Sequence, residues 1–186
     1  MSEAIDNIHR DDAVKLICSH MKYSPEKEIV ALSDACGRTV FEDIRSRYDV
    51  PAVRCSRWDG IVFSYDAYRE IMDRETNAGD FSSWKEGVDY SYSNTGIPVS
   101  REEFDTMVMI EQTRFEDGCL REILPNDVER EQNIIFPGEK MAQGELLASA
   151  GTYVTPAHLN IFAMGGVMTV PVKRKPRVAI IPTGDE

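Results

Sequence analysis

The stretch Arg177-Val-Ala-Ile-Ile-Pro-Thr-Gly-Asp-Glu186 bears most directly on the fold. It is an apolar run rich in branched residues that passes into a Gly-containing acidic loop, which is typical of the first buried strand of an α/β unit. A parallel strand needs a crossover of about a dozen residues to reach its neighbour, and none follows here. We therefore expect residues 177–186 to be the first strand and loop of a truncated α/β domain. An ordinary C-terminal edge strand is the alternative interpretation.

Composition and charge limit the classes of protein. The chain has 186 residues, of which 42% are hydrophobic, enough for one or two domains with a core. Its net charge of −11 argues against nucleic acid as a partner, because phosphate backbones are bound by clustered Lys and Arg. No apolar run approaches the roughly 18 residues that span a bilayer, so no membrane partner is expected. The four widely spaced cysteines favour reduced thiols over disulfides or a zinc site.

Turn signals divide the chain into a middle part and two flanks. The composition changes at Pro51 and returns at Pro137-Gly138, so we expect roughly residues 48–140 to be inserted into a domain built from both flanks. Glu116-Asp-Gly118 predicts a hairpin turn, and residues 77–86 predict an exposed loop. Strands are expected near residues 28–32, 60–63, 88–92, 106–110 and 167–172, and helices near 11–21, 35–40, 65–74 and 157–164.

Three short patches could carry chemistry. In the first, Arg54–Gly60, the carboxylate of Asp59 lies at the start of a predicted strand. It can bind a metal or orient a nucleophile, or it can only accept hydrogen bonds from the amides of a turn. In the second, Thr95 offers a hydroxyl and an amide to an oxyanion, and Gly96 permits a sharp turn. The third, Thr183-Gly-Asp-Glu186, follows a buried strand, where α/β folds place ligands. Plain turns are the alternative for the last two patches.

These patches and several others follow one another in an order typical of one family. The ordered segments are Ala35-Cys-Gly-Arg-Thr-Val-Phe-Glu-Asp43, Asp49-Val-Pro51, Ser56-Arg-Trp-Asp-Gly60, Thr95-Gly-Ile-Pro98, Gly144-Glu-Leu-Leu147, Val154-Thr-Pro156 and Pro171–Glu186. The set resembles the opening of the molybdopterin molybdenumtransferases, the MoeA family that includes the gephyrin E domain. That opening runs L-G-R-V-L-A-E-D, D-x-P, S-A-M-D-G-Y-A and T-G-A-P, and later T-P and T-G-D-E.

The resemblance implies a fold, an activity and partners. The fold would be mixed α+β and β-rich: a linker domain of the MoeA N-terminal type with an inserted β-containing domain, followed by the first strand of a truncated α/β domain. The segments would be residues 1–47 and 141–176 for the linker or dimerisation domain, 48–140 for the insertion and 177–186 for the molybdopterin-binding domain. The whole protein would be a cytoplasmic homodimer in molybdenum cofactor biosynthesis. It would insert molybdate into adenylylated molybdopterin, release AMP and need Mg²⁺, and the molybdopterin adenylyltransferase is a further implied partner.

The resemblance also assigns roles to residues at the matching positions. The active site would lie between the inserted domain of one subunit and the α/β domain of the other. The implied catalytic residues are Asp59, Thr95 and Glu186, the implied metal ligands are Asp59 and Glu186, and the implied cofactor-binding residues are Ser56, Gly96, Thr183, Gly184 and Asp185. Since molybdate and the adenylylated pterin are both anions, carboxylates there require a divalent cation to bring them together.

The chain departs from the family pattern at several positions, among them Trp58 in place of Met and Ile61-Val62 in place of Tyr-Ala. Where the family has G-E-N-x-R-x-x-G-E-D, this chain has Ile135 in place of the Arg and Lys140 in place of the Asp. These changes support an alternative, in which the protein is a divergent paralogue that acts as a dimerisation or binding module without catalysis. In either case we expect the 186-residue chain by itself not to insert molybdate, because most of the pterin pocket would be absent.

Overall fold

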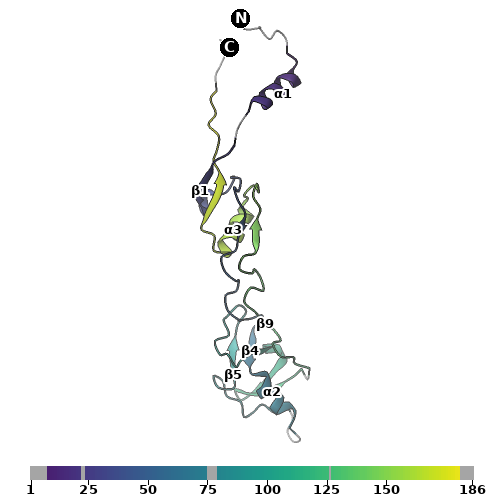
Figure 1. Cartoon of the computed structure of the whole chain (residues 1–186). Coiled ribbons are helices and arrows are strands. Elements are labelled where there is room, and N and C mark those ends of the chain that lie inside the picture. The colour runs from purple at the N-terminus through teal and green to yellow at the C-terminus, as the bar shows by residue number, and fades with distance from the viewer. Residues whose placement is uncertain (1–7, 22–23, 75–78, 126, 181–186) are drawn as a thin grey trace.

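The computed structural model describes residues 8–21, 24–74, 79–125 and 127–180. Figure 1 shows an elongated arrangement in which helix α1 (Arg10–His20) lies at one end and helix α2 (Tyr65–Met72) at the other. Between the ends, the chain forms two lobes. None of the helices in this described part has the length and apolar character needed to cross a membrane.

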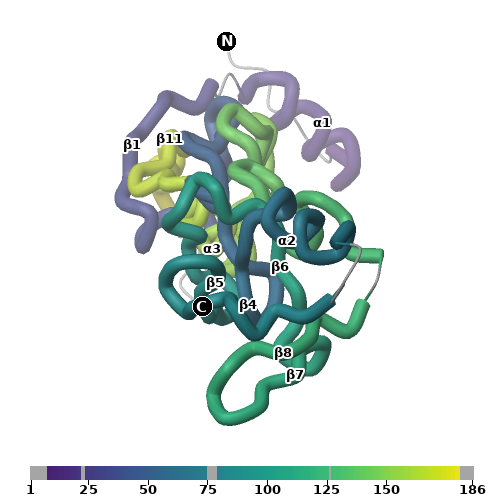
Figure 2. Tube along the Cα trace, turned by 90° about the horizontal axis from the view of Figure 1, so that it is seen from below, coloured from purple at the N-terminus to yellow at the C-terminus, as the bar shows by residue number. Residues whose placement is uncertain are grey.

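The two-segment lobe is built from the early and late parts of the chain. Strand β1 (Lys27–Ala31) pairs antiparallel with β11 (Thr169–Lys173), and β2 (Ile44–Arg45) pairs with β10 (Leu146–Ala148). Helix α3 (Pro156–Met164) packs beside them, and the view down the long axis in Figure 2 shows β1 and β11 side by side. The buried core of the two-segment lobe combines residues of both segments: Ala35, Val40, Ile44, Ala148, Val154, Phe162, Val167, Val170 and Val172.

Local sequence explains the position of α3. Thr155 and His158 form a reciprocal capping box, in which the Thr155 amide donates to His158 Nδ1 at 3.2 Å. Pro156 stands at the first helical position, where its missing N–H is not needed. The helix ends before Gly166, whose φ of +74° suits glycine, and a Cβ there would lie 2.2 Å from the ring of Tyr48. The sequence therefore specifies both ends of this helix.

The single-segment lobe lies between Pro51 and Met141. A three-stranded antiparallel sheet has β4 (Gly60–Phe63) at its centre, between β5 (Tyr90–Ser93) and β6 (Thr106–Met109). All four residues of β4 are buried, because the strand is covered on both faces. Two separate cores result, one on each face of the sheet. The larger core consists of Ile61, Phe63, Tyr68, Ile71, Phe81, Trp84, Tyr90, Val108, Leu120, Ile123 and Val128. The smaller core consists of Val62, Phe104, Met107 and Ile134.

Short elements complete this lobe. Strand β3 (Cys55–Ser56) pairs with β9 (Ile134–Ile135), and a hairpin joins β7 (Thr113–Glu116) to β8 (Cys119–Ile123). The hairpin turn that the sequence predicted is present, and Asp117 and Gly118 both have positive φ there. Two 3₁₀ turns, η1 (Leu32–Asp34) and η2 (Ile110–Gln112), are the remaining elements.

Three local predictions are wrong. The helix expected at residues 35–40 does not form: the short turn η1 ends at Asp34, and the Val40 N–H donates to the distant carbonyl of Thr152 at 2.8 Å. The loop at residues 77–86 is not uniformly exposed: Phe81 and Trp84 are buried and meet edge to face, with ring centroids 4.9 Å apart. Asp11 or Asp12 is the N-cap that the sequence predicts for α1, but the helix is capped by His9.

Two further expectations concern the chain ends. The spacing of Val14, Ile17 and Cys18 predicts an apolar face on α1, but no residue of the helix is buried by the described part of the chain. In the expected strand that starts at Arg177, residues 177–180 belong to no helix or strand, and residues 181–186 lie outside the described residues.

Candidate functional site

Asp59 and Thr95 form the centre of the candidate site. Asp59 ends the connection from β3 to β4, and Thr95 follows β5. The amide of Thr95 donates to Asp59 Oδ1 at 2.7 Å, and its hydroxyl donates to the same oxygen at 3.0 Å. The backbone and side-chain hydrogen bonds from Thr95 lower the pKa of the Asp59 carboxyl below its ordinary value. The exposed carboxylate is therefore ionised at neutral pH.

Strand register brings these two residues together. Gly60 pairs with Ser93 on one side and Met109 on the other, so the residue before β4 meets the loop after β5. The position at Gly60 excludes any side chain, because a Cβ there would lie 2.0 Å from the carbonyl oxygen of Val108. The carbonyl of Asp59 accepts the Ile110 N–H at 3.0 Å. Asp59 is thus held through its backbone by Ile110 and through its side chain by Thr95.

Ser56 forms hydrogen bonds with the loop after β5, which contains Thr95. Its carbonyl accepts the Gly96 N–H at 2.8 Å, and its own N–H donates to the carbonyl of Ile97 at 3.0 Å. Its hydroxyl is buried and donates to the hydroxyl of Ser93 at 2.6 Å. Gly96 has a φ of +79°, which lets the chain turn between Thr95 and Ile97. In this geometry Ser56 positions the loop, whereas Thr95 and Gly96 are exposed to solvent on its outer side.

An ion pair that the sequence analysis did not find ties a further segment to the site. Arg57 bonds to Glu139, which also accepts the Phe136 N–H at 3.1 Å. The hydrogen bond from Arg57 is the main cause that lowers the pKa of Glu139. The two residues lie 82 positions apart. Nothing in the local sequence of either one identifies its partner.

The same segment contains both departures from the family motif. Ile135 is buried in β9, opposite Cys55, so its side chain belongs to the packing of the lobe. Lys140 is exposed, and its N–H donates to the carbonyl of Val50 at 3.0 Å. Neither side chain makes a hydrogen bond or ion pair with Asp59 or Thr95.

The structure brings together only part of the predicted site. Ser56, Asp59, Thr95 and Gly96 lie within one network of hydrogen bonds, whereas Thr183, Gly184, Asp185 and Glu186 lie outside the described residues. Across the described ranges, no three His, Cys, Asp or Glu side chains gather closely enough to hold a metal ion. Sequence reasoning also gave no role to Trp58, whose side chain next to Asp59 is 49% exposed.

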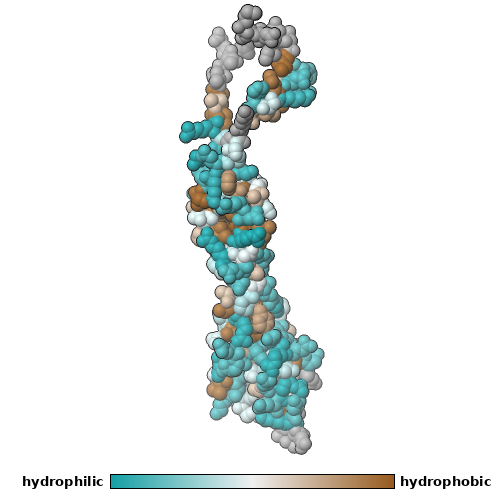
Figure 3. Space-filling model, viewed as in Figure 1, coloured by the Kyte–Doolittle hydropathy of each residue, from teal (hydrophilic) through white to brown (hydrophobic). Residues whose placement is uncertain are grey.

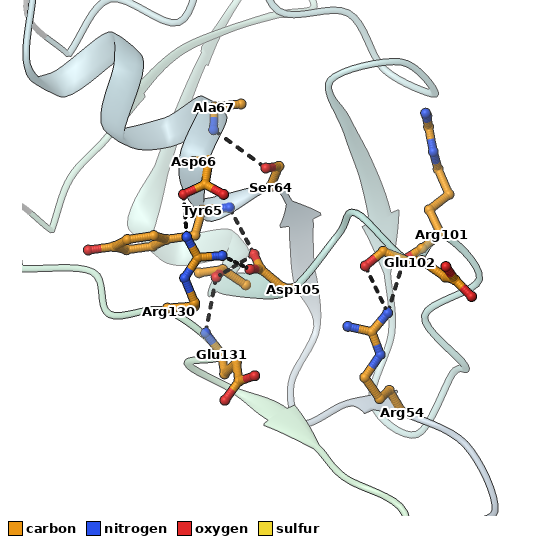
Figure 4. Close-up of polar contacts among 11 residues, drawn as sticks. Arg54, Ser64, Tyr65, Asp66, Ala67, Arg101, Glu102, Asp105, Arg130 and Glu131 are labelled. Atoms are coloured by element: carbon orange, nitrogen blue, oxygen red, sulfur yellow. Dashed lines mark hydrogen bonds and ion pairs between the residues drawn. The ribbon is translucent and has the colours of Figure 1, made fainter.

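A second polar cluster in this lobe has a structural role. Arg130 lies between Asp66 and Asp105 and stacks over the ring of Tyr65 at 4.9 Å (Figure 4). Asp105 also accepts the Tyr65 N–H at 2.8 Å, at the first turn of α2. Because these contacts hold the start of α2 against Asp105, the residue before β6, the cluster explains how the helix is anchored.

Comparisons with known proteins identify the family of the chain. Residues 8–166 match the model of the MoeA N-terminal region, domains I and II. The molybdopterin molybdenumtransferase of Bacillus subtilis (strain 168) is 35% identical over 95% of this chain and 43% of its own length. That of Haemophilus influenzae is 26% identical over 95% of this chain and 44% of its own length.

Solved structures give the same result. The MoeA protein of molybdopterin biosynthesis from Pyrococcus horikoshii OT3 superposes with a TM-score of 0.68 and 26% identity, over 89% of this chain and 46% of that one. A second structure of a MoeA protein from Pyrococcus has a TM-score of 0.71 at 24% identity, over 95% of this chain and 48% of that one, and shows likeness of fold alone.

The fold and the family match define a β-rich region of the MoeA N-terminal type, domains I and II. The chain belongs to the MoeA N-terminal family. It spans less than half the length of the curated relatives it matches.

Proposed function

We propose that this chain is the N-terminal part of an enzyme that inserts molybdate into adenylylated molybdopterin and releases AMP, a step of molybdenum cofactor biosynthesis. The observation that carries the proposal is the Asp59–Thr95 pair, which stands at the two motif positions and forms an ionised carboxylate with a defined orientation. The names of the relatives support the same activity. The intact pair favours the enzyme over the alternative of a non-catalytic binding module.

The donor set at Asp59 fits a hard divalent cation such as Mg²⁺. Both hydrogen bonds from Thr95 go to Oδ1, and Oδ2 accepts none from the described residues. An ionised carboxylate oxygen of this kind is a suitable ligand for Mg²⁺, and Glu186 is the proposed second carboxylate. The bound cation would polarise the phosphoanhydride of the substrate. Thr95 orients Asp59, while Gly96 leaves the adjacent surface open to the substrate.

The remaining residues of the proposed site serve binding. Thr183, Gly184 and Asp185 form the proposed loop for the pterin substrate, at the start of an α/β domain that begins at Arg177. Residues 1–47 and 141–176 form the proposed linker domain, and 48–140 the proposed insertion. The shared core of the two-segment lobe supports this division.

We also propose that the protein is a cytoplasmic homodimer. Figure 3 shows apolar patches on the two-segment lobe, and several large apolar side chains there are exposed, among them Ile29 and Met168. Burying such side chains against a second copy removes apolar area from water. The molybdopterin adenylyltransferase is the proposed supplier of the adenylylated substrate and a further partner.

A chimera tests the proposed function. The matched N-terminal part of the Bacillus subtilis relative is replaced by this chain, and AMP release from adenylylated molybdopterin is measured with molybdate and Mg²⁺. We expect activity in the chimera and its loss in the Asp59→Asn variant. Asp80→Asn, which changes an exposed aspartate in the same lobe, is the matched control and should stay active. Circular dichroism and gel filtration establish that each protein folds; a folded chimera that releases no AMP would contradict the proposal.

A further inference from the structure

A pocket with basic walls lies on the two-segment lobe, where β1 begins and β11 ends. Its volume is about 400 Å³, within the range of small-molecule sites. Four basic side chains line it, together with Gly37 and Thr39: Arg38, Lys173, Arg174 and Lys175. Figure 1 shows that this end of β11 is far from the lobe that carries the Asp59–Thr95 pair. The pocket is therefore separate from the site described above.

Two of the four basic groups are held in place by carboxylates. Arg38 pairs with Glu28 and donates to the carbonyl of Lys173 at 3.1 Å, with only 11% of its side chain exposed. Arg174 pairs with Glu26. The hydrogen bond from Arg38 lowers the pKa of Glu28, so the Glu28 carboxylate is ionised at neutral pH. Arg38 is thus a rigid wall of the pocket rather than a mobile surface group.

The other two cations, Lys173 and Lys175, make no ion pair with any acidic side chain of the described residues. The pocket therefore carries an excess of two positive charges, in a chain whose net charge is −11. In a chain this acidic, lysines placed at random on the surface would usually lie close enough to a carboxylate to form an ion pair. A local excess of cations around a concave surface attracts anions and concentrates them there.

Neutral groups of the pocket suit an oxyanion as well. The hydroxyl of Thr39 makes no hydrogen bond within the described ranges and is a potential donor. Gly37 has a φ of +77°, and the hydroxyl of Tyr153 lies 3.6 Å from where its Cβ would be. The exposed phenol of Tyr153 therefore lies beside Gly37. Ammonium groups with nearby hydroxyl donors form the usual environment of a bound phosphate group.

We propose that this pocket binds a small molecule that carries a phosphate or diphosphate group. Lys173 and Lys175 would contact the phosphate oxygens, Arg38 would form the fixed positive wall and Thr39 would donate from its hydroxyl. The inference does not rest on the proposed molybdate insertion, because it uses residues of the other lobe.

Calorimetric titration of the chain with inorganic pyrophosphate, without divalent cations and at low ionic strength, tests the proposal. We expect saturable binding of one pyrophosphate per chain, which weakens as salt is added. The Lys173→Gln/Lys175→Gln double variant should bind at least about tenfold more weakly, since each lost charged contact contributes on the order of one tenfold step. Arg38 is left intact because it also joins Glu28 to Lys173.

The control neutralises two exposed lysines elsewhere. The Lys15→Gln/Lys85→Gln double variant has the same change in net charge and should bind as the unchanged chain does. Asp59→Asn should also leave the affinity unchanged, which separates this pocket from the proposed catalytic site. Absence of saturable binding overturns the proposal. Equal binding by the Lys173/Lys175 variant also overturns it, because the pyrophosphate would then be an adventitious ion only.

Discussion

The amide and the hydroxyl of Thr95 donate to one and the same carboxylate oxygen of Asp59, at 2.7 and 3.0 Å. The relationship follows from the pairing of Gly60 with Ser93, which brings the residue before β4 against the loop after β5. Two donors on one oxygen stabilise the charged carboxylate and leave the second oxygen for another ligand. The pair is thus an oriented anion at the surface of the lobe.

Removal of the Thr95 hydroxyl should raise the pKa of Asp59. Thr95→Val keeps the backbone N–H and loses one of the two hydrogen bonds that lower this pKa. Because the folded-state pKa is lowered, the stabilisation is present above the unfolded-state pKa and is lost as pH falls through the folded-state value. In the variant this loss should begin at higher pH. NMR titration of the Asp59 carboxyl carbon measures the shift.

Thr113→Val is the matched control for that measurement, because the hydroxyl of Thr113 donates to the carbonyl of Ile110 and not to a carboxylate. The pKa of Asp59 should be the same in this variant as in the unchanged chain. An unchanged pKa in Thr95→Val would show that the hydroxyl does not interact with Asp59 in solution.

Gly60→Ala should destabilise the lobe strongly. Its Cβ would lie 2.0 Å from the carbonyl oxygen of Val108, and the backbone of β6 cannot move away without breaking the ladder. We expect a loss of roughly 3 kcal/mol or more in the free energy of unfolding, measured by urea denaturation. Gly165→Ala should cost less, because its nearest obstacle is the end of the Leu147 side chain at 2.8 Å. Equal losses for the two variants would contradict the geometry at Gly60.

Arg130→Met should lower the melting temperature more than Arg69→Met does. Arg130 bridges Asp66 and Asp105, and the side chain of Asp105 is only 15% exposed. The substitution would therefore leave the largely buried carboxylate of Asp105 without its cationic partner. Arg69 makes one exposed pair with Asp73 within the same helix, and such pairs contribute little. Thermal unfolding followed by circular dichroism compares the two, and a larger effect at Arg69 would rule out the anchoring role.

Trp58 and Trp84 should differ in fluorescence quenching. Trp58 is 49% exposed beside Asp59, whereas Trp84 is 7% exposed and packs against Phe81. Acrylamide should therefore quench mainly Trp58, and Trp58→Phe should remove most of the quenchable emission. Trp84→Phe is the reciprocal variant and should retain it. Equal quenching in both variants would place the two indoles in similar surroundings and refute the exposed position of Trp58.

Light scattering at micromolar concentration tests the proposed dimer. The chain should have twice its monomer mass, and Met168→Glu should shift it toward the monomer, because an exposed apolar side chain at the interface would become charged. Val88→Glu introduces the same charge at an exposed apolar position of the other lobe and should leave the mass unchanged. A monomeric chain at these concentrations would contradict the homodimer.

Local patterns were sufficient for most regular elements. The branched run Gly60–Phe63 predicted β4, the Asp-Gly pair predicted the hairpin turn, and the Thr155-Pro156 start with the Gly165-Gly166 end predicted α3. Each of these signals is carried by the backbone preferences of adjacent residues, which act at short range. The predictions failed where a hydrogen-bond partner far along the chain determines the local structure, as at Val40, whose N–H donates to the carbonyl of Thr152.

The sequence by itself determined the family, the regular elements and the acidic and hydroxyl residues that could form a site, because all of these depend on residue type and order along the chain. Only the tertiary structure decided which of them meet. Strand register placed Thr95 on Asp59 across 36 positions, an ion pair across 82 positions joined Arg57 to Glu139, and the ends of β1 and β11 gathered basic side chains from two separate segments. Pairing at such separations depends on the packing of whole lobes, and no local preference encodes it.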